Sequence, residues 1–129
     1  MKILTNLIIL IFILINVSGF SQPVFNISFS KDKSNAPLDG RLILIISNNN
    51  NAEPRFQIED GLNTQQAFGI DVENWKPGQS ISINNTNAFG YPINTIKEFP
   101  KGDYYIQAIL HKYETFHRKD GHIVKLPMD

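Results

Sequence analysis

The sequence predicts an all-β protein, because short apolar segments alternate with turn signals and no segment has the period of an amphipathic helix. Residues 24–30 alternate between apolar and polar side chains, as in a strand with one buried face. Residues 42–46 are continuously aliphatic, which favours a central strand covered on both faces. Short strands at this spacing indicate a sandwich or a barrel. The other expected strands are 55–58, 67–72, 80–83, 104–116 and 123–126.

One turn favours a sandwich of the immunoglobulin-like type. Phe99, Pro100 and a glycine-containing corner precede Tyr104 and an alternating strand. In immunoglobulin-like sandwiches, a tyrosine near the start of a late strand donates a hydrogen bond back to the corner backbone. We therefore expect an immunoglobulin-like β-sandwich of about seven strands, with Gly102 and Tyr104 at its structural corner. Tyr105 would point to the opposite face and is the alternative corner residue.

The N-terminus has the pattern of an export signal. Met1 and Lys2 give a positive start, residues 7–15 are unbroken apolar, and residues 16–22 are small and polar. This apolar run is much shorter than the roughly 20 residues that a membrane-spanning helix needs. We expect a signal peptide over residues 1–21 and a β-sandwich domain over residues 22–129. The mature protein would be periplasmic or extracellular, without membrane association after cleavage.

Composition narrows the function classes. The chain carries 12 basic and 12 acidic side chains, which argues against a nucleic-acid partner, since such proteins are usually clearly basic. It has no cysteine, so the core must hold without disulfides, and no lipid-carrying cysteine lies at the cleavage region. This favours a bacterial exported protein over a small eukaryotic secreted domain. Nothing in the sequence points to a cofactor.

The C-terminal segment holds the candidate metal ligands. His117 and His122 flank a turn containing Asp-Gly, a strong hairpin signal between two strands. In a loop of about four residues the two imidazoles would face each other, and Glu114 or Asp129 could add an oxygen ligand. Zinc usually takes about three or four protein ligands, so we prefer a cross-strand polar pair and keep metal as the alternative. His111 is interpreted as a residue that fills a sheet face.

No complete catalytic arrangement is visible in the sequence. The segment around Ser80 approaches the nucleophile-elbow motif but lacks its second glycine and leads into a strand instead of a helix. The carboxylate pairs Glu59–Asp60 and Asp71–Glu73 are assigned to loops or strand ends, where charges are normally solvated. We therefore name no catalytic residue.

Aromatic side chains make carbohydrate binding a serious rival function. Flat rings on a sandwich face offer apolar platforms with a polar edge. Tyr91, beside Pro92 in an expected loop, looks free, whereas the other candidates occupy core or corner positions. These others are Trp75, Tyr104, Tyr105 and Tyr113.

Four segments resemble the N-terminal β-sandwich region of secreted bacterial esterase-like proteins of the enterochelin-esterase type. They are Pro37 to Arg41, Glu53 to Ile58, Gly102 to Ala108 and Tyr113 to Asp129. The resemblance covers nearly the whole expected mature chain, and its motifs mark strands and turns. It implies that an α/β-hydrolase domain, which carries the nucleophile, follows the sandwich in full-length relatives. Since the chain stops before such a domain, we expect a truncated product or a fragment, and no catalytic residue is carried over.

The sequence thus predicts an exported, non-catalytic module that packs beside or orients an esterase domain. One alternative is a free-standing carbohydrate- or ligand-binding domain. A small metal-dependent hydrolase using His117 and His122 is the other.

Overall fold

The computed structural model describes residues 21–128 and is all-β apart from two short 3-10 turns. The predicted signal peptide therefore lies, except for Ser21, outside the described residues. The turns are η1 (Pro54–Gln57) and η2 (Ile96–Glu98). The strands are β1 (Phe25–Ile27), β2 (Leu38–Ser47), β3 (Gln66–Trp75), β4 (Ile81–Ile83), β5 (Phe89–Tyr91), β6 (Tyr105–His117) and β7 (Ile123–Pro127).

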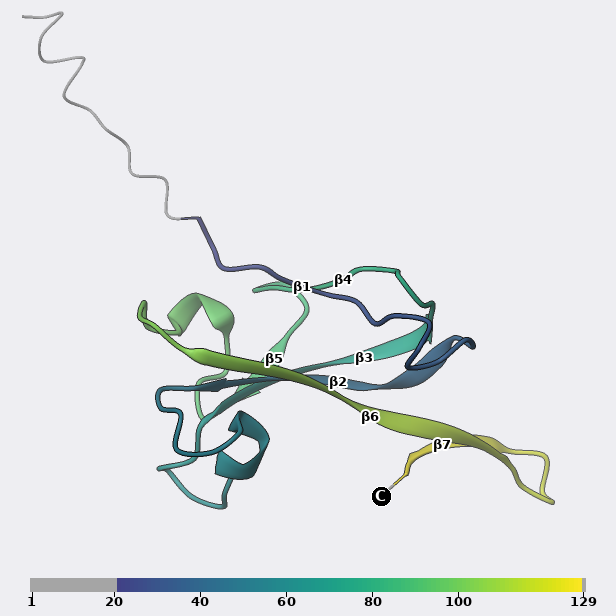
Figure 1. The fold of residues 1–129 in the computed structure, drawn as a ribbon. Coiled ribbons are helices and arrows are strands. Elements are labelled where there is room, and N and C mark those ends of the chain that lie inside the picture. Colours follow the sequence, from purple (N-terminus) through teal and green to yellow (C-terminus); the bar gives the residue numbers. More distant parts are fainter. Residues whose placement is uncertain (1–20, 129) are drawn as a thin grey trace, which may run out of the picture.

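The strands form two antiparallel sheets. One has five strands in the order β5-β3-β2-β6-β7, and the other has only β1 and β4. Figure 1 shows β1 and β4 lying over one face of the larger sheet. The predicted β-sandwich of about seven strands is thus confirmed. Its layers are unequal, so the smaller sheet leaves part of the larger one uncovered.

The core fills the space between the sheets. Alternate residues of β2 and β3 point toward β1 and β4, because side chains along a strand alternate between faces. The buried cluster consists of Leu42, Leu44, Ile46, Phe68, Ile70, Val72, Trp75, Ile83 and Ile96. The Phe29 ring packs edge-on against Trp75, with centroids 4.8 Å apart. Burial of each large apolar side chain stabilises the fold by about 1.5–3 kcal/mol.

β2 is the central strand, as its aliphatic run predicted. It is hydrogen-bonded to β3 on one side and β6 on the other. Leu44 and Ile45, on opposite faces, are both buried. The segment that follows β2 folds back over the face away from β1 and β4, where the Ser47 hydroxyl donates to Oε1 of Gln57 at 2.8 Å. This second cover explains why Leu44–Ser47 of β2 are buried on both faces.

Two elements differ from the prediction. Residues 55–58 were expected to form a strand, but η1 occupies this segment, because Pro54 starts a tight turn in which the Phe56 N–H donates to the Glu53 carbonyl. β5 was not expected at all. It pairs with β3 opposite Phe68, and a Cβ at Gly90 would lie 2.3 Å from the Phe68 ring. Glycine is what permits this close pairing, and its weak strand propensity hides the strand in the sequence.

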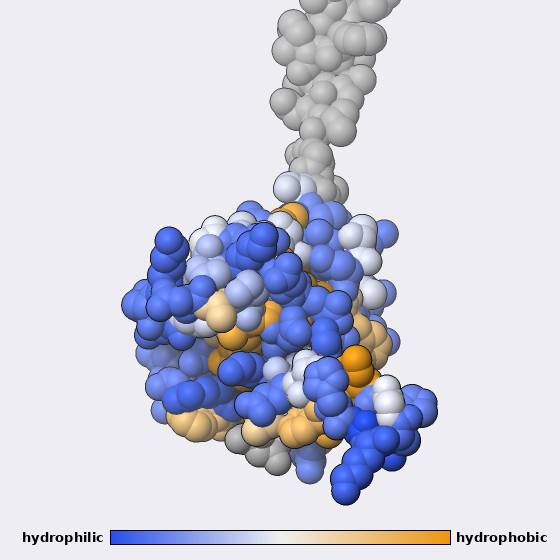
Figure 2. All heavy atoms as spheres, turned by 90° about the vertical axis from the view of Figure 1, so that its right-hand side faces the viewer, coloured by the Kyte–Doolittle hydropathy of each residue, from blue (hydrophilic) through white to orange (hydrophobic). Residues whose placement is uncertain are grey.

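The β6–β7 hairpin extends beyond the body of the sandwich in Figure 1. Most of its side chains are exposed. Figure 2 views the molecule from this end, and hydrophilic side chains dominate there, with hydrophobic ones visible between them. The hairpin is thus a two-stranded projection from the larger sheet.

Candidate functional site

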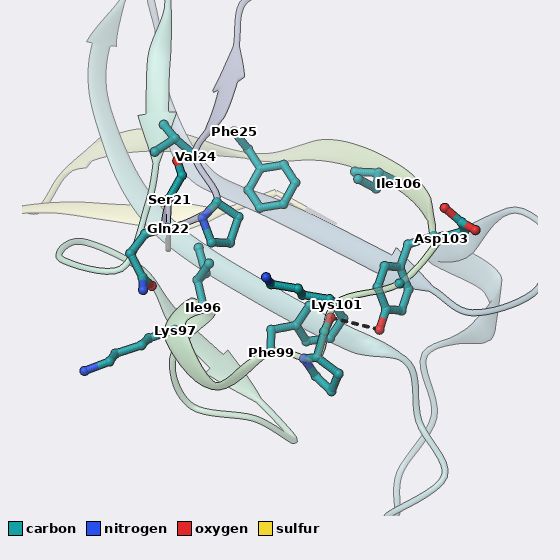
Figure 3. Close-up of a pocket in the computed structure, with 14 residues that line it drawn as sticks. Ser21, Gln22, Val24, Phe25, Ile96, Lys97, Phe99, Lys101, Asp103 and Ile106 are labelled. Atoms are coloured by element: carbon teal, nitrogen blue, oxygen red, sulfur yellow. Dashed lines mark hydrogen bonds between the residues drawn. The ribbon is translucent and has the colours of Figure 1, made fainter. Parts of the chain in front are cut away.

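A groove runs along the open side of the sandwich, between the small sheet and β6. The groove consists of two successive hollows. The first, about 820 Å³, lies between the start of β1 and the corner before β6. The second, about 260 Å³, lies between the end of β1 and residues 108–110 of β6. Figure 3 shows the first hollow. We name it the β1–β6 groove and define it by Val24, Phe25, Ile27, Phe29, Ile106, Ala108 and Leu110.

The groove exists because the small sheet ends at β1. Even-numbered side chains of β6 point to the side on which β1 lies, but no strand among residues 21–128 pairs with the outer edge of β1. Ile106 is therefore 51% exposed and Val24 is 52% exposed. Phe116 and Leu126, whose strand positions face the same way, are exposed as well. Lys112 and Glu114 occupy the same face of β6 between Leu110 and Phe116, so the exposed apolar side chains of the groove are separate from those of the hairpin.

The predicted corner forms one end of the groove. The Tyr104 hydroxyl donates a hydrogen bond to the Pro100 carbonyl oxygen at 3.1 Å, drawn as a dashed line in Figure 3. The Tyr104 and Phe99 rings lie 4.8 Å apart. A Cβ at Gly102 would come within 3.1 Å of the Tyr104 hydroxyl oxygen, so glycine lets the ring lie flat on the turn. Tyr105, the alternative corner residue, is 49% exposed.

On the far face of the larger sheet, one ion pair and one hydrogen bond connect three strands. The carboxylate of Asp71 in β3 lies 3.0 Å from the Arg41 guanidinium of β2 and accepts a hydrogen bond from the Tyr113 hydroxyl of β6 at 3.2 Å. Burial, followed by this contact with Asp71, raises the pKa of Tyr113. The β2–β3 register places Arg41 directly opposite Asp71. These contacts hold the strands in register.

A second cluster ties β7 to the body. The Lys125 ammonium lies 3.0 Å from Asp39 and 3.2 Å from Glu73. The Asn74 backbone N–H donates to Asp39 at 2.7 Å. This hydrogen bond, followed by Lys125, lowers the pKa of Asp39, and the two carboxylates raise the pKa of Lys125.

The sequence assigned Asp71 and Glu73 to loops or strand ends with solvated charges. Both carboxylates are exposed, as expected, but they lie within β3 and have basic partners that sequence reasoning missed. Their spacing of two residues on one strand could have signalled a shared face. The contact between Glu73 and Lys125 could not be predicted from the sequence alone, because Lys125 lies on β7, which is not adjacent to β3.

The histidine pair does not have the expected geometry. His117 pairs with Ile123, so the loop is Arg118–His122 and His122 lies within it instead of opposite His117. Gly121, with φ of +86°, and the Asp120 side chain, which accepts the His122 N–H at 3.1 Å, set this longer loop. The His122 Nδ1 lies 3.3 Å from Asp120.

The other predicted ligands are dispersed. Glu114 pairs with Leu126, exposed His111 lies opposite Arg41, and Asp129 falls outside the described residues. Within residues 21–128, no group of three or more histidine, cysteine, aspartate or glutamate side chains is arranged to hold a metal ion.

The remaining candidates lie apart from one another. Ser80 was expected to be a strand residue, but it is exposed and lies just before β4. Glu59 and Asp60 are exposed in the loop after η1, as had been expected. Among the described residues, none of these three side chains forms a hydrogen bond or an ion pair with a histidine.

Aromatic side chains are exposed on β5. Phe89 and Tyr91 are 66% and 52% exposed and share one face of the strand, because Gly90 between them points into the core. Trp75 is buried, and Tyr104 and Tyr113 are half-buried. Tyr105 was assigned to the core or corner, but it is exposed, because its position on β6 faces away from β1.

The fold and site define a β-sandwich protein whose smaller sheet leaves one apolar groove open. No family model matches the chain, and neither a curated protein nor a solved structure matches it. In the part of the chain that the structure describes, no helix has the length and apolar character needed to cross a bilayer.

Proposed function

We propose that the protein is an exported, non-catalytic binding module that docks against an α/β-hydrolase domain of the esterase type. The observation that carries the proposal is the apolar lining of the β1–β6 groove, where Val24 and Ile106 are about half exposed. Contiguous exposed apolar surface on a soluble protein commonly marks a site of protein association. The floor of the groove lies on β6, so its side chains are held in fixed positions and need little ordering when a partner binds.

The resemblance to the sandwich region of esterase-like proteins supports the identity of the partner. In such proteins the catalytic nucleophile belongs to the following hydrolase domain, so the sandwich has a positioning role. The N-terminal pattern of residues 1–21 supports export. The module would thus act on the exported hydrolase by orienting it.

The test is to produce the full chain together with an α/β-hydrolase domain encoded directly downstream of Asp129 or in an adjacent gene. We expect the two to co-purify, and Ala108→Asp in the groove to separate them, since a charge there would be buried without a partner. Thr115→Asp, at an exposed position on the other face of β6, is the matched control and should leave the complex intact. Thermal melts establish that both variants fold.

Three results would overturn the proposal. These are the lack of any such hydrolase in the genomic neighbourhood, co-purification that Ala108→Asp does not weaken, and hydrolysis of short-chain aryl esters by the purified chain alone.

A carbohydrate-binding function is the second candidate, favoured by the exposed Phe89 and Tyr91 on one face of β5. Adjacent rings on a rigid strand suit stacking on sugar rings. The test is a calorimetric titration of the full chain with soluble xylan and with cello-oligosaccharides. Saturable binding lost in Tyr91→Ala would favour this function. Unchanged binding in that variant, or no binding of either glycan, would reject it.

A further inference from the structure

We propose that an extended segment of the partner completes the β1–β6 groove. The segment adds as a strand to the free edge of β1 and lays alternate apolar side chains on β6. This inference rests on the proposed function, since it takes the groove face as the docking face, and it names the part of the partner that enters.

The backbone of β1 supplies the first argument. β1 pairs with β4 over Phe25–Ile27, and within residues 21–128 no strand pairs with its other edge. Some of its main-chain N–H and C=O groups therefore point outward over the groove. Such an edge is a template for a further strand. In immunoglobulin-type sandwiches the corresponding sheet has more strands than two, and the second layer extends further over the first.

The floor of the groove supplies the second argument. Ile106, Ala108 and Leu110 occupy alternate positions on one face of β6, and they line the two hollows in order along the strand. Residues 24 and 25 line the first hollow and residues 27–29 the second, so β1 follows β6 along the groove. An occupant with the two-residue period of a strand would match this floor. Roughly six residues, about 20 Å of extended chain, would fill the groove.

Charge supplies the third argument. Lys97 and Lys101 line the first hollow and Lys33 lines the second, while Asp103 is the single carboxylate among the described residues of either lining. In Figure 3 the Lys101 side chain points toward the middle of the hollow, whereas Asp103 points away from it. The lining of the groove thus carries more basic than acidic side chains. The occupant should carry acidic residues on both sides of its apolar core.

The layering of the fold argues against a second copy as the occupant. The larger sheet continues past β1 with β6 and then β7. A second copy that paired its β1 antiparallel to this β1 would bring its own β6 and β7 toward the same side as the β6 and β7 of the first copy. A single extended segment brings no further strands with it.

The experiment uses the full chain and the synthetic peptide acetyl-Asp-Asp-Val-Thr-Val-Thr-Val-Asp-Asp-amide, whose three valines match the three β6 positions. We expect saturable binding with a Kd on the order of 10–100 µM by calorimetry. A peptide that is N-methylated at alternate residues, on the edge that faces β1, should bind at least about tenfold more weakly, because it cannot donate to β1. A peptide with lysines in place of the aspartates should also bind more weakly, with a difference that narrows as salt is added.

Protein variants locate the peptide. Ala108→Asp should weaken binding at least about tenfold, and Thr115→Asp should leave it unchanged. The inference is overturned by any of three results: no saturable binding up to about 1 mM, equal binding of the N-methylated peptide, or no effect of Ala108→Asp.

Failure of this inference is distinguishable from failure of the proposed function. If the hydrolase domain co-purifies but no peptide binds, the partner docks by its folded surface and only the strand addition is wrong. If the peptide binds but no hydrolase domain associates, the groove accepts a strand and the assignment of the partner is wrong.

Discussion

At the residue scale, Gly90 and Asn74 hold backbone positions that few residues tolerate. A Cβ at Gly90 would overlap the Phe68 ring, so β5 can join the sheet only through glycine. Asn74 has φ of +51°, in the left-handed region that asparagine enters more readily than most residues. Its N–H donates to Asp39 in β2. Asn74 thus lies where the β2–β3 register shifts, and Gly90 permits the pairing at the outer edge of β3.

The corner tyrosine gives a prediction at this scale. Tyr104→Phe should lower the free energy of unfolding by about 1 kcal/mol, since it removes the hydrogen bond to Pro100 without changing the packing on Phe99. Urea unfolding measures the difference. Tyr105→Phe is the control and should change stability by less than about 0.5 kcal/mol, because Tyr105 is exposed. Equal losses in the two variants would show that the Tyr104 hydrogen bond is not what stabilises the corner.

At the element scale, the β6–β7 hairpin depends on contacts from outside itself. Two strands alone are marginal in water. Here Lys125 of β7 reaches Asp39 of β2 and Glu73 of β3. The ion pairs fasten β7 to the body across the width of β6.

Asp39 should make the stability of this connection depend on pH. Its pKa is lowered in the folded protein, first by the Asn74 N–H and then by Lys125, so its contribution to stability is present above the unfolded pKa of about 4 and is lost as pH falls through the folded pKa. Asp39→Asn should melt a few degrees lower than the wild type at neutral pH. The difference in melting temperature between Asp39→Asn and the wild type should disappear in strong acid. A gap that stays constant from neutral to strongly acidic pH would contradict a role for the Asp39 charge.

The hairpin loop gives a second prediction at the element scale. His117→Ala and His122→Ala should each change stability by no more than about 1 kcal/mol, and their effects should add, because the register separates the two side chains. Elemental analysis of the purified full chain should find no stoichiometric zinc. Tight binding of one zinc per chain, abolished by either substitution, would restore the metal interpretation.

At the scale of the whole molecule, the sequence predicts the strands that have long periodic patterns but not their arrangement. β2 and β6 were recognisable from aliphatic continuity and alternation. β5 was not, because Gly90 interrupts a very short strand, and η1 was mistaken for a strand because Phe56 and Ile58 alternate with polar residues. The groove could not be predicted at all. It depends on which strands lie at the edge of the small sheet, and local sequence does not encode that edge.

Export is a prediction for the whole chain. When the full reading frame is expressed in a bacterial host, the protein recovered from the periplasm or medium should begin near Gln22, because residues 7–15 and the small residues after them match a cleavable signal. Intact-mass measurement of the recovered protein provides the test. A variant with Leu10→Arg should stay inside the cell as the uncleaved chain. Recovery of exported protein that still carries Met1 would contradict cleavage.

The central position of β2 has a consequence for the order of folding. One of its two neighbours, β3, is close in the sequence, but the other, β6, begins only at Tyr105. During synthesis β2 therefore leaves the ribosome long before the strand that closes its second edge. Such distant pairing slows folding and delays its completion until nearly the whole chain has emerged. A chain built in this way therefore stays unfolded for longer than one whose strands pair in sequence order. While it is unfolded, it can pass through a narrow channel.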